Sequence, residues 1–318
     1  MLSENTAFLF PGQGSQAIGM LAAASQDYAS VGQTFSEASD VLGYDMWDLV
    51  QQGEQEQLNL TETTQPVLLT ASVALWRSWR AAGGAIPKLM AGHSLGEFSA
   101  LVCAGAISFP DAVRLVQQRG AFMQSAVPVG EGAMAAIIGL EDAAINEACT
   151  RAATESGAVV AAVNYNSPGQ VVIAGKTHAV DLAIEYCKAA GARRALPLPV
   201  SAPFHTVLMQ PAGEKLQAAL AGIHVSAPEI PVVHNVHAQT ESDPVKIRQL
   251  LVQQLYSPVQ WTSCIGAISG AGVSRLVECG PGKVLSGLNR RIDKSLESFT
   301  IEQPADMNST LQAISQGA

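Results

Sequence analysis

A serine flanked by glycines is the strongest chemical signal in the sequence. Residues 92–96 read Gly-His-Ser-Leu-Gly, a G-x-S-x-G pattern between an apolar run that predicts a strand and a stretch that predicts a helix. This is the context of a nucleophile elbow, in which glycines permit a sharp turn that exposes the serine hydroxyl. The helix would also present free N–H groups beside Ser94. A serine that only caps the helix is the alternative, and we expect Ser94 to be a nucleophile.

A serine nucleophile needs a base, and the sequence has six histidines. His205 is the candidate, because it follows a proline-punctuated loop and comes after Ser94, as in serine hydrolases with this elbow. We expect the side chain of His93 to point away from Ser94. His234 and His237 lie in a late strand region with no nearby carboxylate or cysteine, which predicts a structural role rather than a metal site.

No aspartate stands out as the third member of a triad. Between Ser94 and His205, we expect Asp111, Asp142 and Asp181 to lie at helix starts or on a polar helix face. A Ser-His dyad whose imidazole is oriented by a backbone carbonyl fits better. Such a site suits an activated acyl donor such as a thioester, whose thiol leaving group has a pKa near ~8.5.

A glycine-rich turn near the start of the chain supports a competing hypothesis. Gly12, Gly14 and Ala17 follow a short apolar strand, precede a helix-like stretch and fit the dinucleotide fingerprint. The chain would then be a non-catalytic nucleotide-binding domain. The fingerprint requires an acid at the end of the second strand, whereas Glu37 falls within a predicted helix, so this interpretation is the weaker one.

Composition narrows the function classes. The 318 residues include 18 Lys and Arg against 27 Asp and Glu, and a net charge of −9 argues against nucleic-acid binding through the overall field. The apolar runs are far shorter than the ~20 residues of a membrane span, and no signal peptide opens the chain. Five scattered cysteines without a CxxC pair predict a reduced, cytoplasmic protein.

The elements around these residues predict an α/β fold. Strands alternate with amphipathic helices, which favours a larger domain with a mostly parallel sheet that carries the nucleophile elbow. From residue 132 the pattern becomes β-α-β-β-α-β, the order of a ferredoxin-like arrangement. We therefore expect a small inserted ferredoxin-like domain at 128–198 and a large catalytic domain made of 1–127 and 199–318. A helix capped by Ser108, and a C-terminal helix with a short tail, are also expected.

Eight motifs carry a family resemblance over nearly the whole chain. In order they are FPGQGSQ, TQPVLLTA, AGHSLGEFSAL, LVQQRGAFMQ, EGAMAAIIGL, NYNSPGQVVIAG, SAPFH and ECGPGKVLSGLNRR. Together they closely resemble the bacterial malonyl-CoA:acyl carrier protein transacylases of the acyltransferase family. GHSLGE is shared with the wider family, including polyketide synthase domains. A phenylalanine just before the histidine is typical of the malonyl-specific branch.

The resemblance implies a role for each matching residue. Ser94 matches the nucleophile and His205 the base. The other matches are Gln13 and Leu95, whose backbone N–H groups would form the oxyanion hole; Arg119, which would pair with the malonyl carboxylate; Met123, Met134 and Phe204, which would line the acyl pocket; and Gln254, whose main-chain carbonyl would hold the histidine. The chain departs from the family at Phe98, at Thr206 and in VVHNVHA, where two histidines replace small or acidic residues. None of these positions has a proposed catalytic role.

The implied reaction is a two-step transfer. A malonyl group would pass from malonyl-CoA to Ser94 and then to the phosphopantetheine thiol of acyl carrier protein, for fatty acid biosynthesis, without a metal or other cofactor. An acyltransferase of polyketide synthesis and a serine thioesterase or esterase are the alternatives, and a buried Arg119 would disfavour a general esterase. Both substrates are anionic, so basic residues must receive them. The candidates are Lys188, Arg193, Arg194, Lys283, Arg290, Arg291 and Lys294, each of which has solvated surface charge as its alternative interpretation.

Overall fold

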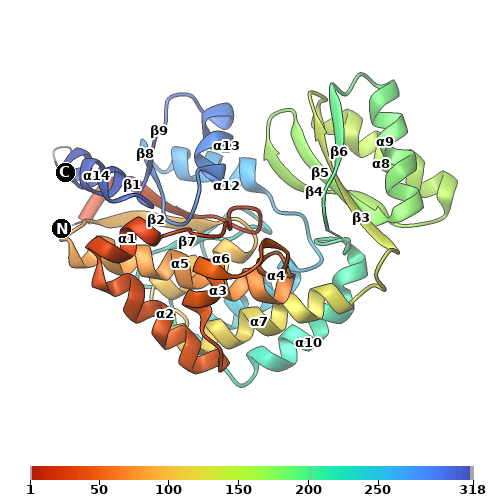
Figure 1. Ribbon diagram of the computed structural model, residues 1–318. Coiled ribbons are helices and arrows are strands. Elements are labelled where there is room, and N and C mark those ends of the chain that lie inside the picture. The colour runs from red at the N-terminus through yellow and green to blue at the C-terminus, as the bar shows by residue number, and fades with distance from the viewer. Residues whose placement is uncertain (1, 201, 316–318) are drawn as a thin grey trace.

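A five-stranded parallel sheet lies at the centre of the larger part of the molecule (Figure 1). The computed structural model describes residues 2–200 and 202–315, and the strand order is β7-β2-β1-β8-β9. The strands are β1 (Leu2–Phe10), β2 (Ile86–Gly92), β7 (Val232–Val233), β8 (Arg275–Glu278) and β9 (Glu297–Thr300). Each neighbouring pair is parallel, so the predicted α/β fold with a mostly parallel sheet is confirmed.

Helices cover both faces of this sheet, which is why residues 6–10 of β1 and 89–92 of β2 are buried. Phe8 and Phe10 of β1 pack into one core cluster with α2, α5, α6 and α7, while Ala7 and Leu9 point into a second cluster with α12 and α13. The helices of this part are α1 (Ala22–Asp27), α2 (Ala29–Leu42), α3 (Met46–Gln52), α4 (Gln55–Leu58), α5 (Thr61–Ala81), α6 (Leu95–Cys103), α7 (Phe109–Ser125), α10 (Gln210–Leu220), α11 (Pro244–Gln254), α12 (Trp261–Gly270), α13 (Val284–Ile292) and α14 (Pro304–Ser315), with a short 3₁₀ turn at Val207–Met209.

Local signals account for several helix boundaries. The Ser108 hydroxyl accepts a hydrogen bond from the Asp111 N–H at the start of α7, which confirms the predicted cap. The C-terminal helix is present as α14, and the last three residues of the predicted tail lie outside the described residues. No helix within residues 2–200 and 202–315 is both long and apolar enough to cross a membrane.

A second sheet, antiparallel, stands beside the first (Figure 1, green). Its order is β4-β5-β3-β6, and its elements are β3 (Gly132–Ile138), α8 (Asp142–Ser156), β4 (Val160–Ser167), β5 (Gln170–Lys176), α9 (Thr177–Ala189) and β6 (Arg194–Pro197). The predicted β-α-β-β-α-β order is confirmed, and the sheet shares its own core cluster with α8 and α9. That this unit is a separate domain with boundaries at 128 and 198 stays a prediction.

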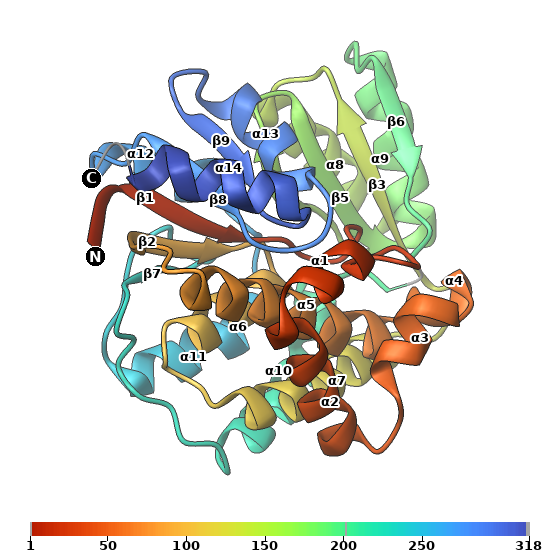
Figure 2. The same ribbon diagram turned by 60° about the vertical axis from the view of Figure 1, so that its left-hand side comes forward.

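Three loops meet at the carboxyl edge of the parallel sheet (Figure 2). Phe10 pairs with Gly92 and Ala91 with Val233, so the segments that follow β1, β2 and β7 leave the sheet side by side. The segment after β1 runs through turns, and α1 begins only at Ala22, so the helix-like stretch expected directly after the glycine-rich turn is wrong. The dinucleotide fingerprint therefore lacks its helix N-terminus.

Candidate active site

The backbone at Ser94 has the strained geometry of an elbow between β2 and α6. Ser94 has φ 51° and ψ −104°, an unfavourable conformation for a residue with a side chain. The turn is held against β1 because Gly96 has no side chain, since a Cβ there would lie 2.0 Å from the Phe10 carbonyl oxygen. The hydroxyl of Ser94 consequently faces the space above the carboxyl edge of the sheet.

The glycine-rich turn after β1 packs on this elbow. A Cβ on Gly12 would lie 2.5 Å from the His93 carbonyl oxygen, so only glycine permits this approach. Gln13 and Leu95 line the same pocket as Ser94. Leu95 is the first residue of α6, and N–H groups in the first turn of a helix have no partner within it. The turn thus borders the site of Ser94, which disfavours the pyrophosphate-binding alternative.

His205 reaches Ser94 from the other side of the pocket. Its Nε2 lies 2.9 Å from the Ser94 hydroxyl, and its Nδ1 lies 2.8 Å from the main-chain oxygen of Gln254. An Nδ1–H donated to that oxygen leaves the Nε2 lone pair for the serine proton. Burial, together with the charge of Arg119, lowers the pKa of His205 to about 3. The imidazole is therefore neutral, as a base must be before it accepts a proton.

Among the residues that the structure describes, the side-chain hydrogen bonds of His205 run to Ser94 and Gln254 and not to an aspartate. Asp111 accepts from the capping hydroxyl of Ser108, Asp142 begins α8, and Asp181 is exposed on α9. The histidine next to the serine, His93, is directed away, with its Nε2 lying 2.8 Å from the Asn166 side-chain oxygen. The structure thus pairs one serine with one histidine.

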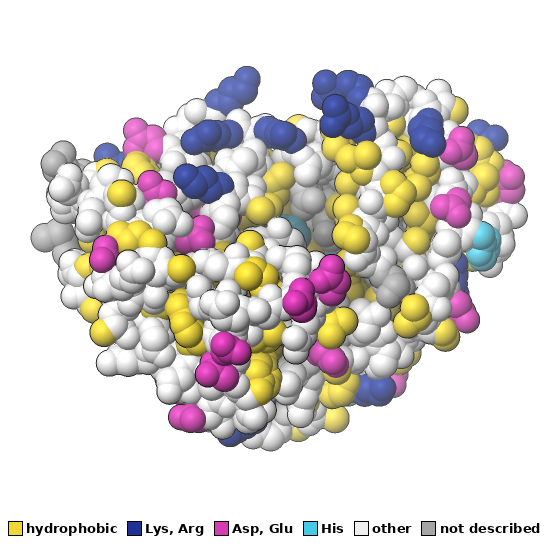
Figure 3. All heavy atoms as spheres, viewed as in Figure 1, with side chains coloured by type: hydrophobic (Ala, Val, Ile, Leu, Met, Phe, Trp, Pro, Cys, Tyr) yellow, Lys and Arg dark blue, Asp and Glu magenta, His cyan; other side chains and the backbone are white. Residues whose placement is uncertain are grey.

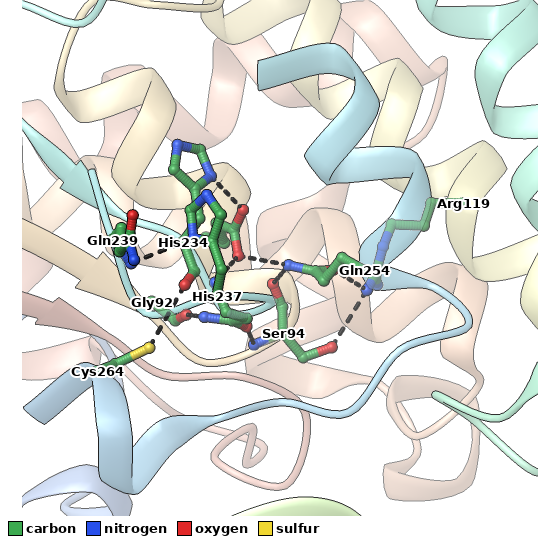
Figure 4. Close-up of polar contacts among 10 residues, drawn as sticks. Gly92, Ser94, Arg119, His234, His237, Gln239, Gln254 and Cys264 are labelled. Atoms are coloured by element: carbon green, nitrogen blue, oxygen red, sulfur yellow. Dashed lines mark hydrogen bonds and ion pairs between the residues drawn. The ribbon is translucent and has the colours of Figure 1, made fainter. Parts of the chain in front are cut away.

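Arg119 lies buried beside the serine (Figure 4). Only 1% of its surface is exposed. Its guanidinium donates to the side-chain oxygens of Gln65 and Gln254, at 2.8 Å each, and to the Ser94 hydroxyl at 3.1 Å. Burial lowers the pKa of Arg119 to about 9, so the side chain remains cationic at neutral pH. Among the described residues no carboxylate forms an ion pair with Arg119, and a buried cation in this state favours an anionic ligand.

The pocket that holds these groups is small and mainly apolar. Its volume is about 120 Å³, and Met123, Met134 and Phe204 line it together with Ser94 and Arg119. The parallel-sheet part and the antiparallel part both contribute, since Met134 lies on β3. Figure 3 shows the molecular surface hollowed between the two parts. The arrangement suits a short acyl group with a terminal carboxylate.

Several polar residues of the site were not predicted from the sequence. Asn235 accepts from the Ser94 N–H and donates to the Gly92 carbonyl, at 2.7 Å each, so it fastens the elbow from both sides. Gln65 of α5 holds Arg119. The position of Asn235 just after the short strand β7 was an available signal, because the carboxyl ends of parallel strands meet at one edge.

The prediction that His234 has no nearby carboxylate is wrong. Its Nδ1 lies 2.8 Å from Oε1 of Glu97, a wholly buried residue in the first turn of α6. Glu97 is also an acid between Ser94 and His205 in the chain, and its carboxylate accepts from Gln254 Nε2 rather than from His205. Within the described residues no cluster of three or more His, Cys, Asp or Glu is arranged to hold a metal ion.

The basic candidates fall into three groups. Arg193, Arg194 and Arg291 line one cavity, and Figure 3 shows Lys and Arg side chains on both sides of the upper rim of the hollow. Lys188 is exposed and forms an ion pair with Glu185. Lys283 is exposed and forms an ion pair with Asp306. Arg290 and Lys294 are exposed near the end of α13.

Comparison with known proteins places the chain in a family. Residues 7–298 match the model of the acyl transferase domain. The malonyl CoA-acyl carrier protein transacylase of Salmonella typhimurium is 59% identical over 305 residues, which covers 96% of this chain and 98% of the relative.

Solved structures agree with this assignment. The acyl carrier protein S-malonyltransferase of Vibrio cholerae has a TM-score of 0.94 and 57% identity, covering 96% of this chain and 99% of that one. A malonyl-transacylase solved in complex with its type II polyketide synthase acyl-carrier protein has a TM-score of 0.95 and 54% identity, covering 97% and 99%. With the family's domain matched and its members this similar along their whole length, the chain belongs to the acyl transferase family, in the branch of the malonyl CoA-acyl carrier protein transacylases.

Proposed function

We propose that the protein transfers a malonyl group from malonyl-CoA to the phosphopantetheine thiol of acyl carrier protein, through a malonyl ester on Ser94. The observation that carries the proposal is the buried guanidinium of Arg119, 3.1 Å from the Ser94 hydroxyl. A carboxylate that entered this pocket unpaired would lose its hydration at a large energetic cost. Two parallel hydrogen bonds from the guanidinium would offset that loss and orient the acyl group.

In the first half-reaction the Ser94 oxygen attacks the thioester carbonyl carbon. The hydroxyl proton passes to Nε2 of His205, which lies 2.9 Å away, while Gln254 fixes the other nitrogen. The negative charge on the carbonyl oxygen is received by the N–H groups of Gln13 and Leu95, and such a donor contributes roughly 3 kcal/mol to lowering a barrier. The C–S bond then breaks, and the coenzyme A sulfur takes the proton from His205.

The second half-reaction repeats the chemistry with a new thiol. The phosphopantetheine thiol gives its proton to His205 as its sulfur attacks the malonyl ester carbonyl. The C–O bond breaks, and the proton on Nε2 returns to the Ser94 oxygen. One base and one oxyanion site serve both steps, so the kinetics should be ping-pong. Met123, Met134 and Phe204 enclose the acyl chain, and coenzyme A is a substrate rather than a resident cofactor.

The carrier protein is the partner in this proposal, and fatty acid biosynthesis is the process we assign. A polyketide carrier is the second candidate acceptor, because a relative 54% identical to this chain was solved with one. A hydrolase is disfavoured, since a general esterase has no use for a buried arginine. We also propose a cytoplasmic location, supported by the five cysteines, all of which are free thiols.

Transfer between purified substrates tests the proposal. We expect radiolabelled malonyl to move from malonyl-CoA to holo acyl carrier protein, with parallel double-reciprocal plots. Apo carrier protein, which lacks the phosphopantetheine thiol, is the matched control and should receive no label. Label appearing as free malonate at the same rate with and without carrier would identify a hydrolase instead. Parallel assays with a fatty acid carrier and a polyketide carrier rank the two acceptors.

A further inference from the structure

Glu97 is a buried carboxylate that the proposed reaction does not use. It lies one turn after Ser94 and has no exposed surface. Its Oε1 lies 2.8 Å from Nδ1 of His234, and its Oε2 accepts from the Asn235 N–H at 2.9 Å and from Gln254 Nε2 at 2.8 Å. The carboxylate thus contacts two segments that are distant from it in the chain, His234–Asn235 and the end of α11 at Gln254.

The contact with Gln254 determines which way that side-chain amide points. Its Nε2 lies between two groups that only accept, the Glu97 carboxylate and the Ser94 main-chain oxygen, at 2.8 and 3.0 Å. Its Oε1 faces Arg119, which only donates, at 2.8 Å. Both ends therefore require the same orientation, and Figure 4 shows the Gln254 side chain between Ser94 and Arg119.

The same contacts link two buried charges of opposite sign. Arg119 is 1% exposed, and the negative charge of Glu97 supports its cationic form against the effect of burial. Gln254 carries the connection from one to the other. The main-chain oxygen of Gln254, which holds His205, belongs to the backbone at the end of α11 and does not depend on the amide orientation.

From these contacts we propose that Glu97 is a positioning residue for recognition of the malonyl carboxylate, an inference that rests on the proposed function. By accepting from Gln254 Nε2, it keeps the amide oxygen on Arg119 and so holds the guanidinium beside Ser94. Without Glu97, the Ser94 main-chain oxygen is the remaining acceptor on Nε2, so the amide holds its oxygen on Arg119 less firmly and the guanidinium is less well fixed beside Ser94. Recognition of a charged donor should then weaken, while chemistry on an uncharged donor depends less on Arg119.

Glu97→Met and Glu97→Gln test this directly. Methionine fills the space without an acceptor. Glutamine can keep its oxygen on the Asn235 N–H and on Gln254 while its NH₂ group faces His234, whose imidazole can accept at Nδ1 in its other neutral tautomer. Acylation of Ser94 is measured with malonyl-CoA and with acetyl-CoA at enzyme excess, by quenching and intact-protein mass, to give kcat/KM for each donor.

We expect Glu97→Met to lower kcat/KM for malonyl-CoA by roughly 10- to 100-fold, the range for a lost hydrogen bond to a charged group, with acetyl-CoA changed less than about threefold. Glu97→Gln should restore most of the malonyl rate. In a variant that already carries Arg119→Ala, adding Glu97→Met should leave the malonyl-to-acetyl ratio of kcat/KM unchanged, because Glu97 affects this ratio through Arg119. Glu278→Met, which removes a buried carboxylate 1% exposed on β8, is the matched control and should preserve the ratio.

An unchanged malonyl-to-acetyl ratio in folded Glu97→Met overturns the inference. If that variant does not fold, Gln254→Met decides, since it leaves Glu97 its contacts with His234 and Asn235 and retains the main-chain oxygen that holds His205. A preserved ratio in Gln254→Met rules out the route from Glu97 to Arg119 through Gln254 and overturns the inference, whereas a lost ratio supports it. Failure of the wild-type protein to acquire malonyl at all would refute the proposed function, which is a separate outcome.

Discussion

Replacing Arg119 with alanine should shift the preferred acyl donor from malonyl-CoA towards acetyl-CoA. The guanidinium is 1% exposed and makes hydrogen bonds at 2.8, 2.8 and 3.1 Å, so it is held in one place before any ligand arrives. A malonyl carboxylate would lose two charge-assisted hydrogen bonds of about 1.5–3 kcal/mol each. Their loss corresponds to a fall of roughly 10²–10⁴ in kcat/KM for malonyl-CoA. Acetyl-CoA, which leaves a buried cation unpaired in the wild-type pocket, should gain relative to malonyl-CoA.

The measurement is kcat/KM for both donors with the wild-type protein, Arg119→Ala and Arg119→Lys. Lysine keeps the charge but cannot reproduce the planar fork, so it should weaken malonyl transfer without favouring acetyl. Arg119→Ala also removes the hydrogen bonds that Gln65 and Gln254 accept from the guanidinium, which lowers the stability of the variant. The ratio of the two donors within one variant does not depend on how much of it is folded. Equal losses for both donors would make Arg119 a structural residue and refute this reasoning.

Four further predictions concern His205, the elbow at Ser94 and the basic residues Arg193 and Arg194. Burial lowers the pKa of His205 to about 3, so the base stays neutral throughout the range from roughly pH 5 to 8. A plot of kcat/KM for malonyl-CoA against pH should therefore show no loss of activity with a midpoint near 6.5, the ordinary pKa of histidine, and such a midpoint would contradict a neutral buried base. As the pH falls below 6.5, His205 binds a proton in the unfolded chain but not in the folded protein, which favours unfolding. In urea denaturation the free energy of unfolding of the wild type should therefore fall by up to about 1.4 kcal/mol per pH unit relative to that of His205→Asn. Asn235→Ala removes the hydrogen bonds to the Ser94 N–H and the Gly92 carbonyl and should lower the free energy of unfolding by about 2–4 kcal/mol in the same assay. Asn308→Ala, at an exposed position, is the control and should lower it by less than about 0.5 kcal/mol. Equal effects of the two variants would show that Asn235 does not hold the elbow. Joint replacement of Arg193 and Arg194 by alanine should raise KM for malonyl-CoA most at low salt, and a KM that salt does not alter would mean ordinary surface charges.

Local sequence signals predicted most of the fold. The serine cap at the start of α7 is set by neighbours within one turn, and the β-α-β-β-α-β order follows from short apolar runs separated by amphipathic ones. The elbow was also predictable, because its glycines, its strand and its helix are adjacent in the chain. The helix expected directly after the glycine-rich turn was wrong, since that segment packs as turns against the elbow before α1 begins at Ala22.

The polar support of the site was not predictable in the same way. Asn235 and Glu97 act on Ser94 and Gln254 across 141 and 157 residues of chain, and no local pattern encodes such contacts. The carboxylate partner of His234 was missed for the same reason. Only the packing of α6 against the loop after β7 brings that histidine to Glu97.

The central claim is that Ser94 carries the malonyl group between the two thiols, and intact-protein mass spectrometry tests it most directly. The wild-type protein mixed with malonyl-CoA should gain the mass of one malonyl group, located on Ser94 by peptide mapping. Holo acyl carrier protein should then remove that mass and acquire it. Ser94→Ala is the matched control and should stay unmodified, since alanine is no larger than serine. A malonyl adduct that forms on Ser94→Ala, or a wild-type adduct that the carrier cannot discharge, would contradict the claim.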